Sequence, residues 1–131
     1  MKKDIQIDPV ENVFVAVVLE YNTIYKTNDW VAYLSNEKNV DLEMVLITSK
    51  GFDGERKTSE MRHKIAVLPA LSAARIELLQ KEVLELDNSF KVTFFENNKL
   101  FEKNFLLKKN TAKEAKVRMI PSLQKKGILL Q

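Results

Sequence analysis

The clearest pattern in the chain is a series of short segments rich in β-branched and aromatic residues, separated by Asn, Asp and Gly. Such segments are typical of antiparallel β-sheet, because successive side chains of a strand point to opposite faces. The predicted strands cover 13–19, 30–34, 42–48 and 58–68, and two more form a hairpin over 90–107. Strict alternation in the third segment puts Leu42, Met44 and Leu46 on one face of the sheet.

The hairpin over 90–107 is the most closely specified element. Asn97 and Asn98 both tolerate the left-handed backbone that a two-residue turn requires. A turn at these residues predicts four opposed pairs: Glu96 with Lys99, Phe94 with Phe101, Val92 with Lys103, and Phe90 with Phe105. One face then carries mainly phenylalanine, and a slip of one residue would bury the charged face instead. Lys103 is the charged exception on the apolar face, so we expect it at the end of the sheet or with its stem turned outward.

Residues 72–86 fit two patterns. Apolar residues recur at helical spacing over 76–86, whereas residues 72–78 also alternate as in a strand. We favour a strand to about residue 79 followed by one or two helical turns, with a continuous helix as the alternative.

After residue 110 the strand pattern stops. Thr111 can cap a short helix over 112–119, and Pro121 would end it. The number and spacing of the segments predict an all-β fold, an immunoglobulin- or fibronectin-like antiparallel sandwich of about seven strands. We expect this domain to cover residues 1–110. Residues 111–131 would form a basic, partly helical C-terminal extension, packed on the domain or tethered to it.

Several segments resemble a family of short uncharacterised bacterial β-sandwich proteins, and the similarity extends over nearly the whole chain. It is carried by Asn12-Val13-Phe14-Val15-Ala16-Val17-Val18, by Glu43-Met44-Val45-Leu46 with Ser49-Lys50-Gly51, and by Lys91-Val92-Thr93-Phe94-Phe95 with Lys99-Leu100-Phe101. Some members of that family are labelled phenylalanyl-tRNA synthetase alpha subunit. The resemblance implies the sandwich fold, and it implies no established activity or functional residues.

Composition bears on the compartment. The chain contains no cysteine, which excludes a disulfide framework and fits a reducing environment. The apolar run at 13–19 is too short to span a membrane, and Asp4, Asp8 and Glu11 precede it where a signal peptide would be basic. We therefore expect a cytoplasmic protein that does not contact a membrane.

Charge is distributed unevenly along the chain. Residues 103–131 contain eight basic side chains and one acidic side chain, although the net charge of the whole chain is only +3. The candidate nucleic-acid contacts among them are Lys108, Lys109, Lys113, Lys116, Arg118, Lys125 and Lys126. Lysines attract nucleic acid without reading its sequence, but this segment has no aromatic residue after Phe105 to stack on bases. A strap held against the acidic body is the interpretation we favour.

Candidate catalytic chemistry rests on a single histidine. His63 belongs to an alternating stripe over 61–67 that is expected to face the core, so we interpret it as a hydrogen-bonded structural residue. A triad with Asp53 and Ser59 is the catalytic alternative. One histidine and no cysteine leave oxygen ligands for a metal, and neither 53–55 nor 82–87 has calcium-loop spacing. The sequence therefore predicts no enzyme activity, metal or cofactor.

The leading hypothesis is a non-enzymatic protein-interaction module that binds through loops or through an exposed edge strand, which could also pair two copies. The candidate protein contacts are Tyr21, Tyr25, Tyr33 and Phe52. The tyrosines could form an exposed patch of the kind found at interfaces, or they could cover sheet edges. The alternative function is that of an RNA- or ribosome-associated protein using the basic C-terminal residues.

Overall fold

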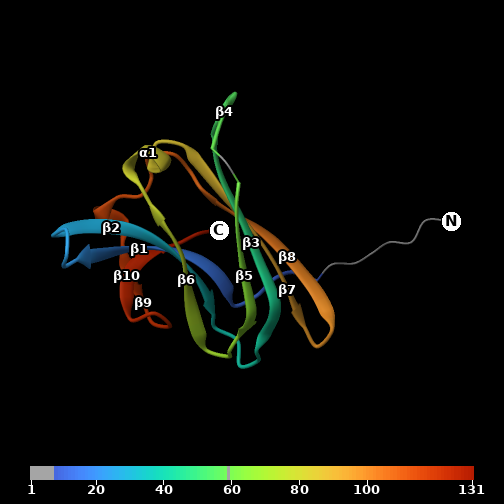
Figure 1. Cartoon of the computed structure of the whole chain (residues 1–131). Helices are drawn as coiled ribbons and strands as arrows, with labels where there is room; N and C mark the ends of the chain where they lie inside the picture. The colour runs from blue at the N-terminus through green and yellow to red at the C-terminus, as the bar shows by residue number, and fades with distance from the viewer. Residues whose placement is uncertain (1–7, 59) are drawn as a thin grey trace.

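The computed structural model describes residues 8–58 and 60–131, whose strands form two antiparallel sheets packed face to face (Figure 1). The first sheet contains β6 (Ser72–Leu79), β2 (Thr27–Asn36), β1 (Val13–Asn22), β10 (Lys125–Leu129) and β9 (Arg118–Ile120), in that order. The second contains β4 (Arg56–Lys57), β3 (Leu42–Asp53), β7 (Asp87–Glu96) and β8 (Lys99–Leu107), and β5 (Met61–Leu68) also pairs with β3. The all-β prediction is confirmed, but the described residues form ten strands and not about seven.

The core lies between the two sheets. Alternate residues of each strand point inward, so Val15 and Val17 of β1 meet Phe90 and Phe94 of β7 in one buried cluster. No helix in the described residues is long and apolar enough to cross a membrane.

The β7–β8 hairpin has the predicted register, with Phe94 opposite Phe101 and Glu96 opposite Lys99. The turn residues Asn97 and Asn98 have φ angles of 51° and 62°. The Phe94 and Phe101 rings stack with their centroids 5.3 Å apart. On the same face, the Lys103 ammonium lies 4.9 Å from the centroid of the Phe105 ring, so the lysine is held by a cation–π contact.

The prediction that side chains alternate strictly along β3 is wrong, because the strand contains a bulge. The register between β3 and β7 shifts between Glu43 and Leu46, and Met44 has a φ of 50°. The extra residue reverses the faces, so Leu42 and Val45 are both buried while the Met44 side chain is 70% exposed.

Residues 72–86 follow the strand-and-turn alternative. β6 ends at Leu79, and a single helical turn, α1 (Lys81–Leu84), follows it. The chain then enters β7 at Asp87.

The prediction of a helix over 112–119 is wrong. This region contains a 3-10 turn of three residues, Glu114–Lys116, and then β9 and β10, which extend the first sheet beyond β1. The physical reason is that β1 offers an unpaired edge, and the alternating residues Ile128 and Leu130 can pack into the core from there. Gly127 permits the close approach, since a Cβ at this position would lie 2.7 Å from the carbonyl oxygen of Val17.

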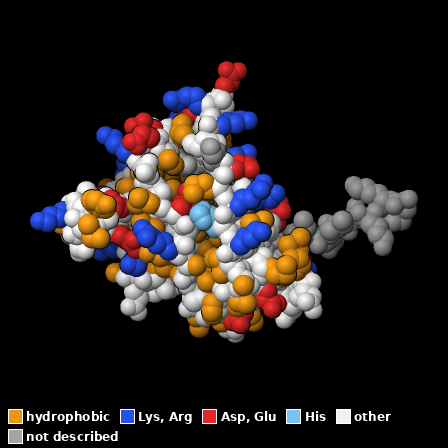
Figure 2. Space-filling view, viewed as in Figure 1, with side chains coloured by type: hydrophobic (Ala, Val, Ile, Leu, Met, Phe, Trp, Pro, Cys, Tyr) orange, Lys and Arg blue, Asp and Glu red, His pale blue; other side chains and the backbone are white. Residues whose placement is uncertain are grey.

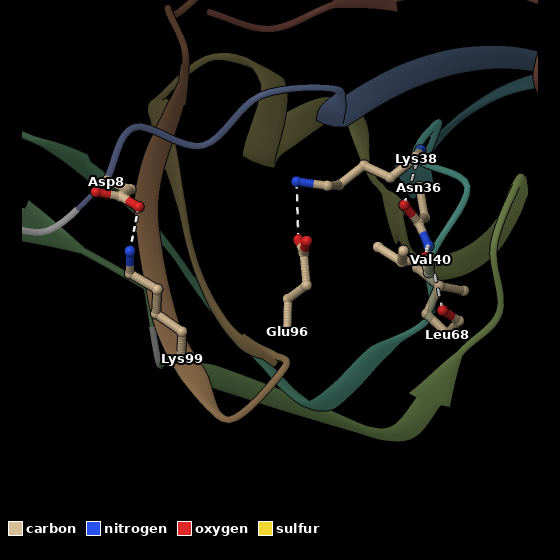
Figure 3. Close-up of polar contacts among 7 residues, drawn as sticks. All are labelled: Asp8, Asn36, Lys38, Val40, Leu68, Glu96 and Lys99. Carbon is tan, nitrogen blue, oxygen red and sulfur yellow. Dashed lines mark hydrogen bonds and ion pairs between the residues drawn. The ribbon is translucent and has the colours of Figure 1, made fainter.

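Polar contacts hold one end of the sandwich together (Figure 3). Asn36, at the end of β2, is fully buried, and its amide donates hydrogen bonds to the carbonyls of Val40 at 2.9 Å and Leu68 at 3.3 Å. Lys38 reaches from the β2–β3 loop to the β7–β8 hairpin, where its Nζ lies 2.8 Å from Oε1 of Glu96. These contacts join the loops that connect the two sheets. They also supply the hydrogen-bond partners that buried polar groups require.

Candidate functional site

The β1–β2 hairpin projects beyond the first sheet (Figure 1). The two strands pair along their whole length, from Val13 opposite Asn36 to Asn22 opposite Thr27. On one side β10 pairs with β1 only as far as Val18, and on the other β6 ends opposite Trp30. Beyond these residues the hairpin has no neighbouring strand in the described part of the chain.

The tip of this hairpin carries large exposed side chains. Tyr21 is 59% exposed, Ile24 is 82% exposed and Tyr25 is 76% exposed. These three residues are named here the tip cluster. Orange side chains are visible on the projecting end at the left of Figure 2.

The tip backbone is held in place by Asn22. Its side-chain oxygen accepts hydrogen bonds from the backbone N–H groups of Ile24 at 2.9 Å and Tyr25 at 3.1 Å. The Asn22 amide donates to Asp29 at 3.2 Å, and Thr27 also donates to Asp29. The tip cluster is therefore presented on an ordered turn, which reduces the entropy lost on binding.

The base of the hairpin is fixed by a polar network on the outer face of the first sheet. The Tyr33 hydroxyl donates to Glu20, and Nζ of Lys125 lies 3.0 Å from Oε2 of the same carboxylate. Burial and the hydrogen bond to Glu20 raise the pKa of Tyr33 to about 12. Burial alone would raise the pKa of Glu20, but the hydrogen bonds from Tyr33 and Lys125 outweigh it and hold that pKa below its ordinary value of 4.5.

Two hollows flank the hairpin. One of about 310 Å³ on the outer face is lined by Tyr21, Tyr33 and Arg75, among others. The other, of about 560 Å³, lies between β2, the end of β6 and α1, and Trp30 and Leu78 line it. The hairpin is thus accessible on both flanks as well as at its tip.

The structure separates the four predicted protein contacts. Tyr21 and Tyr25 belong to the tip cluster, whereas Tyr33 lies at the base with its hydroxyl bonded to Glu20. Phe52 belongs to the second sheet, where it pairs with Asp87 and Lys57, and it is partly buried. Ile24 was not among the predicted contacts, although an aliphatic residue within the otherwise polar or aromatic segment 21–28 is a signal that could have identified it.

His63 contacts a carboxylate other than the predicted Asp53. Its Nε2 lies 3.1 Å from Oε1 of Glu77 in β6, and the Ser49 hydroxyl donates to the same oxygen at 2.6 Å. Asp53 instead contacts Arg56 and Lys109, which hold its pKa below the ordinary value, and Ser59 lies outside the described residues.

This cluster of Ser49, His63 and Glu77 differs from a nucleophilic triad. In a nucleophilic triad the histidine lies between the hydroxyl and the carboxylate and takes the hydroxyl proton. In this cluster the Glu77 carboxylate lies between the Ser49 hydroxyl and the His63 ring. A bulge in β6 creates the arrangement, because its register with β2 shifts so that Glu77 pairs with the buried Ala32 and faces inward. Glu77 therefore bridges the sheets, and no short-range sequence pattern indicates it.

The basic C-terminal residues do not form one row. Lys109 contacts Asp53 in the second sheet at 3.4 Å, and Lys125 contacts Glu20 in the first. The other five are exposed and lie on different elements: Lys108 after β8, Lys113 and Lys116 at the 3-10 turn, Arg118 in β9 and Lys126 in β10.

Groups of three or more side chains able to ligate a metal through His, Cys, Asp or Glu were not found in residues 8–58 and 60–131. Comparison of the chain with protein-family models, with curated proteins and with solved structures finds no match.

Proposed function

We propose that the protein is a non-enzymatic interaction module that binds another protein through the tip cluster of the β1–β2 hairpin. The observation that carries this proposal is the exposure of Tyr21, Ile24 and Tyr25 on an ordered, projecting turn. Aromatic side chains are enriched at protein interfaces because they bury much area with few rotatable bonds. A fold that needed these residues for its own stability would bury them.

The strand pairings support a more specific fold within this proposal, that of the immunoglobulin and fibronectin type III sandwiches. β1, β2 and β6 would take the places of strands A, B and E, and β3, β7 and β8 those of C, F and G. β5 pairs with β3 as a C′ strand pairs with C, and β9 and β10 are additions beside A. Modules with this architecture commonly bind through loops at the ends of the sandwich, where the tip cluster lies.

A cytoplasmic location and membership of the short bacterial β-sandwich family are part of the same proposal. The absence of cysteine and the three resembling segments support them.

The test is an affinity purification with three matched proteins. One is the native chain, one carries Tyr21→Ser, Ile24→Ser and Tyr25→Ser, and the control carries Leu100→Ser, Leu106→Ser and Met119→Ser at other exposed sites. A partner should be retained by the native chain and the control but not by the tip variant. With the purified partner, we expect the tip variant to bind about 100-fold more weakly, since two lost aromatic contacts are worth roughly 2–3 kcal/mol. A partner that binds the tip variant and the native chain equally well would refute the proposal.

One further variant distinguishes the RNA-binding alternative. Deletion of the basic C-terminal residues would also remove β9 and β10 from the first sheet, so point substitutions are the better test. Labelled RNA should instead be titrated with the native chain and with a Lys113→Glu, Lys116→Glu variant, at low and physiological salt. RNA binding that falls steeply with salt and is lost in this variant, but not in the tip variant, would favour nucleic acid over protein as the partner.

A further inference from the structure

The second sheet has a long open edge at β5. β5 pairs with β3 from Leu42 opposite Leu68 to Ser49 opposite Met61, and no other strand of the described residues pairs with it. An antiparallel edge strand of this length presents unpaired backbone N–H and C=O groups to a further strand. β6 and β8 are also edge strands, of eight and nine residues, whereas the edge strand β9 has only three.

The face beside this edge is positively charged. Arg62 pairs with Thr48, Thr48 pairs with Lys91 on its other side, and Lys64 pairs with Leu46, so all three cations share the outer face of the sheet. Lys50 follows Thr48 on the same face of β3 and is exposed. We name Lys50, Arg62, Lys64 and Lys91 the cationic patch, and Figure 2 shows blue side chains gathered beside the histidine.

Acidic residues balance the patch only in part. Glu60 lies 3.7 Å from Arg62 and Glu102 lies 3.8 Å from Lys91, and these distances are too long for hydrogen bonds. The patch therefore has four cations against two loosely placed carboxylates, and positive charge remains along the edge.

The opposite face of β5 carries two apolar residues, Met61 and Ile65, on either side of His63, whose ring contacts Glu77. Met61 pairs with the buried Ser49 and so points toward the other sheet, yet its side chain is 49% exposed. Ile65 on the same face is partly buried against the core. A strand added to this edge would thus have cations beside its outward side chains, and Met61, Ile65 and the paired His63 beside its inward ones.

A second copy of the chain is a poor occupant of the edge. Antiparallel pairing of β5 with itself would bring Arg62 and Lys64 opposite or diagonal to their own copies, and like charges across a strand pair are destabilising. Charge complementarity instead favours a strand with acidic residues at alternate positions.

We propose that the edge of β5 binds an extended peptide segment of a partner protein, in which acidic residues alternate with apolar residues, as an added strand of the second sheet. Its acidic side chains would lie about 5 Å from Arg62 and Lys64, the separation of cross-strand neighbours. Main-chain hydrogen bonds would supply affinity, and the cationic patch would supply specificity. This surface belongs to the second sheet and is independent of the tip cluster.

The probe is a fluorescein-labelled peptide of eight residues that alternates glutamate and valine, titrated by fluorescence anisotropy at low and physiological salt. Two control peptides separate the contributions. One replaces glutamate by lysine, and the other keeps glutamate but carries N-methylated backbone amides, which cannot pair as a strand. We expect the glutamate peptide to bind and both control peptides to bind at least about tenfold more weakly.

Matched variants locate the site. Arg62→Glu with Lys64→Glu should weaken binding of the glutamate peptide about tenfold or more, whereas Lys113→Glu with Lys116→Glu changes the net charge equally and should not. If the charge-reversed edge fails to fold, as judged by circular dichroism, Arg62→Ser with Lys64→Ser provides a milder test with the same expected direction.

Other outcomes would overturn the proposal. Equal binding by the edge variant would place the peptide elsewhere, and equal binding of the N-methylated peptide would show charge attraction without strand pairing. If the protein forms a dimer that the peptide does not disrupt and that the edge variants abolish, the edge of β5 binds a second copy of the chain instead. The tip variant should bind the glutamate peptide as the native chain does, so failure of this proposal and failure of the hairpin proposal are distinguishable.

Discussion

The β1–β2 and β7–β8 hairpins are similar in length but place their aromatic residues differently. Strands of nine or ten residues form both. In β7–β8, Phe90, Phe94 and Phe105 are at most 1% exposed, and the turn consists of two asparagines. In β1–β2 the tip carries two tyrosines that are more than half exposed.

The difference arises from the neighbours of each hairpin. β7 lies between β3 and β8 and its inner face is opposed by the first sheet, so its apolar side chains have partners along the strand. β1–β2 extends past both of its neighbours, so the residues at its tip have none within the described chain. Aromatic residues therefore stabilise the fold in one hairpin, while in the other they are available to a partner.

The largest effect should come from exchanging an aromatic residue for alanine in each hairpin. Phe94→Ala should lower the free energy of unfolding by about 3–5 kcal/mol, because it leaves a cavity in the core. Tyr25→Ala should change it by no more than about 0.5 kcal/mol, because the ring is exposed. Urea denaturation measures both, and comparable losses would show that the tip packs on the body in solution.

The turns should respond in opposite directions. Asn98 and Lys26 both have positive φ, at 62° and 55°, a conformation that asparagine tolerates better than lysine. Asn98→Lys should therefore destabilise the protein by about 0.5–1 kcal/mol, and Lys26→Asn should stabilise it by a similar or smaller amount. Thermal unfolding of the two variants tests this, with Asn28→Lys, an exposed position in β2 opposite Tyr21, as the control. A loss of stability in Lys26→Asn would contradict it.

The base of β1–β2 should show a pH dependence. Because the folded pKa of Glu20 is below 4.5, its contribution to stability is present above that pH and is lost as the pH falls through the folded value. At pH 7 the free energy of unfolding of the native chain should exceed that of Glu20→Gln by less than about 1 kcal/mol, since the site is partly solvated. The two stabilities should converge in acid.

Chemical denaturation between pH 8 and pH 3 measures this difference. Tyr33→Phe removes the hydroxyl that donates to Glu20, so in this background the effect of Glu20→Gln should shrink. An unchanged difference across the whole range would show that the network does not stabilise the fold.

The smallest effect on stability is expected for the tip variant. Replacing Tyr21, Ile24 and Tyr25 by serine removes exposed surface and should alter the free energy of unfolding by less than about 0.5 kcal/mol in total. The same variant should lose partner binding. If the tip variant loses partner binding but is also several kcal/mol less stable than the native chain, the tip cluster has a structural role.

Local patterns predicted local structure well. The β7–β8 register follows from residues 90–107 alone, because the turn and the apolar face lie in one continuous segment. The bulges in β3 and β6 could not be predicted in this way, since each exists only as a shift against a distant strand. The bulge in β6 turns Glu77 inward, so the partner of His63 was missed.

The C-terminal residues show the same limit. Capping signals at Thr111 and Pro121 indicated a helix, but the open edge of β1, near the other end of the chain, made strands more favourable. The sequence left open whether Tyr21 and Tyr25 are exposed or cover a sheet edge. They are exposed because β10 and β6 both end before they reach the tip of the hairpin.

By itself, the sequence determined the all-β class, the β7–β8 register and the composition of the face that β7–β8 buries. These depend on side-chain alternation and turn chemistry, which act over a few residues. The tertiary structure alone decided which edges remain open, which aromatic residues remain exposed and which polar groups meet between the sheets. Those outcomes depend on where strands distant in sequence begin and end beside one another, and no local pattern encodes that.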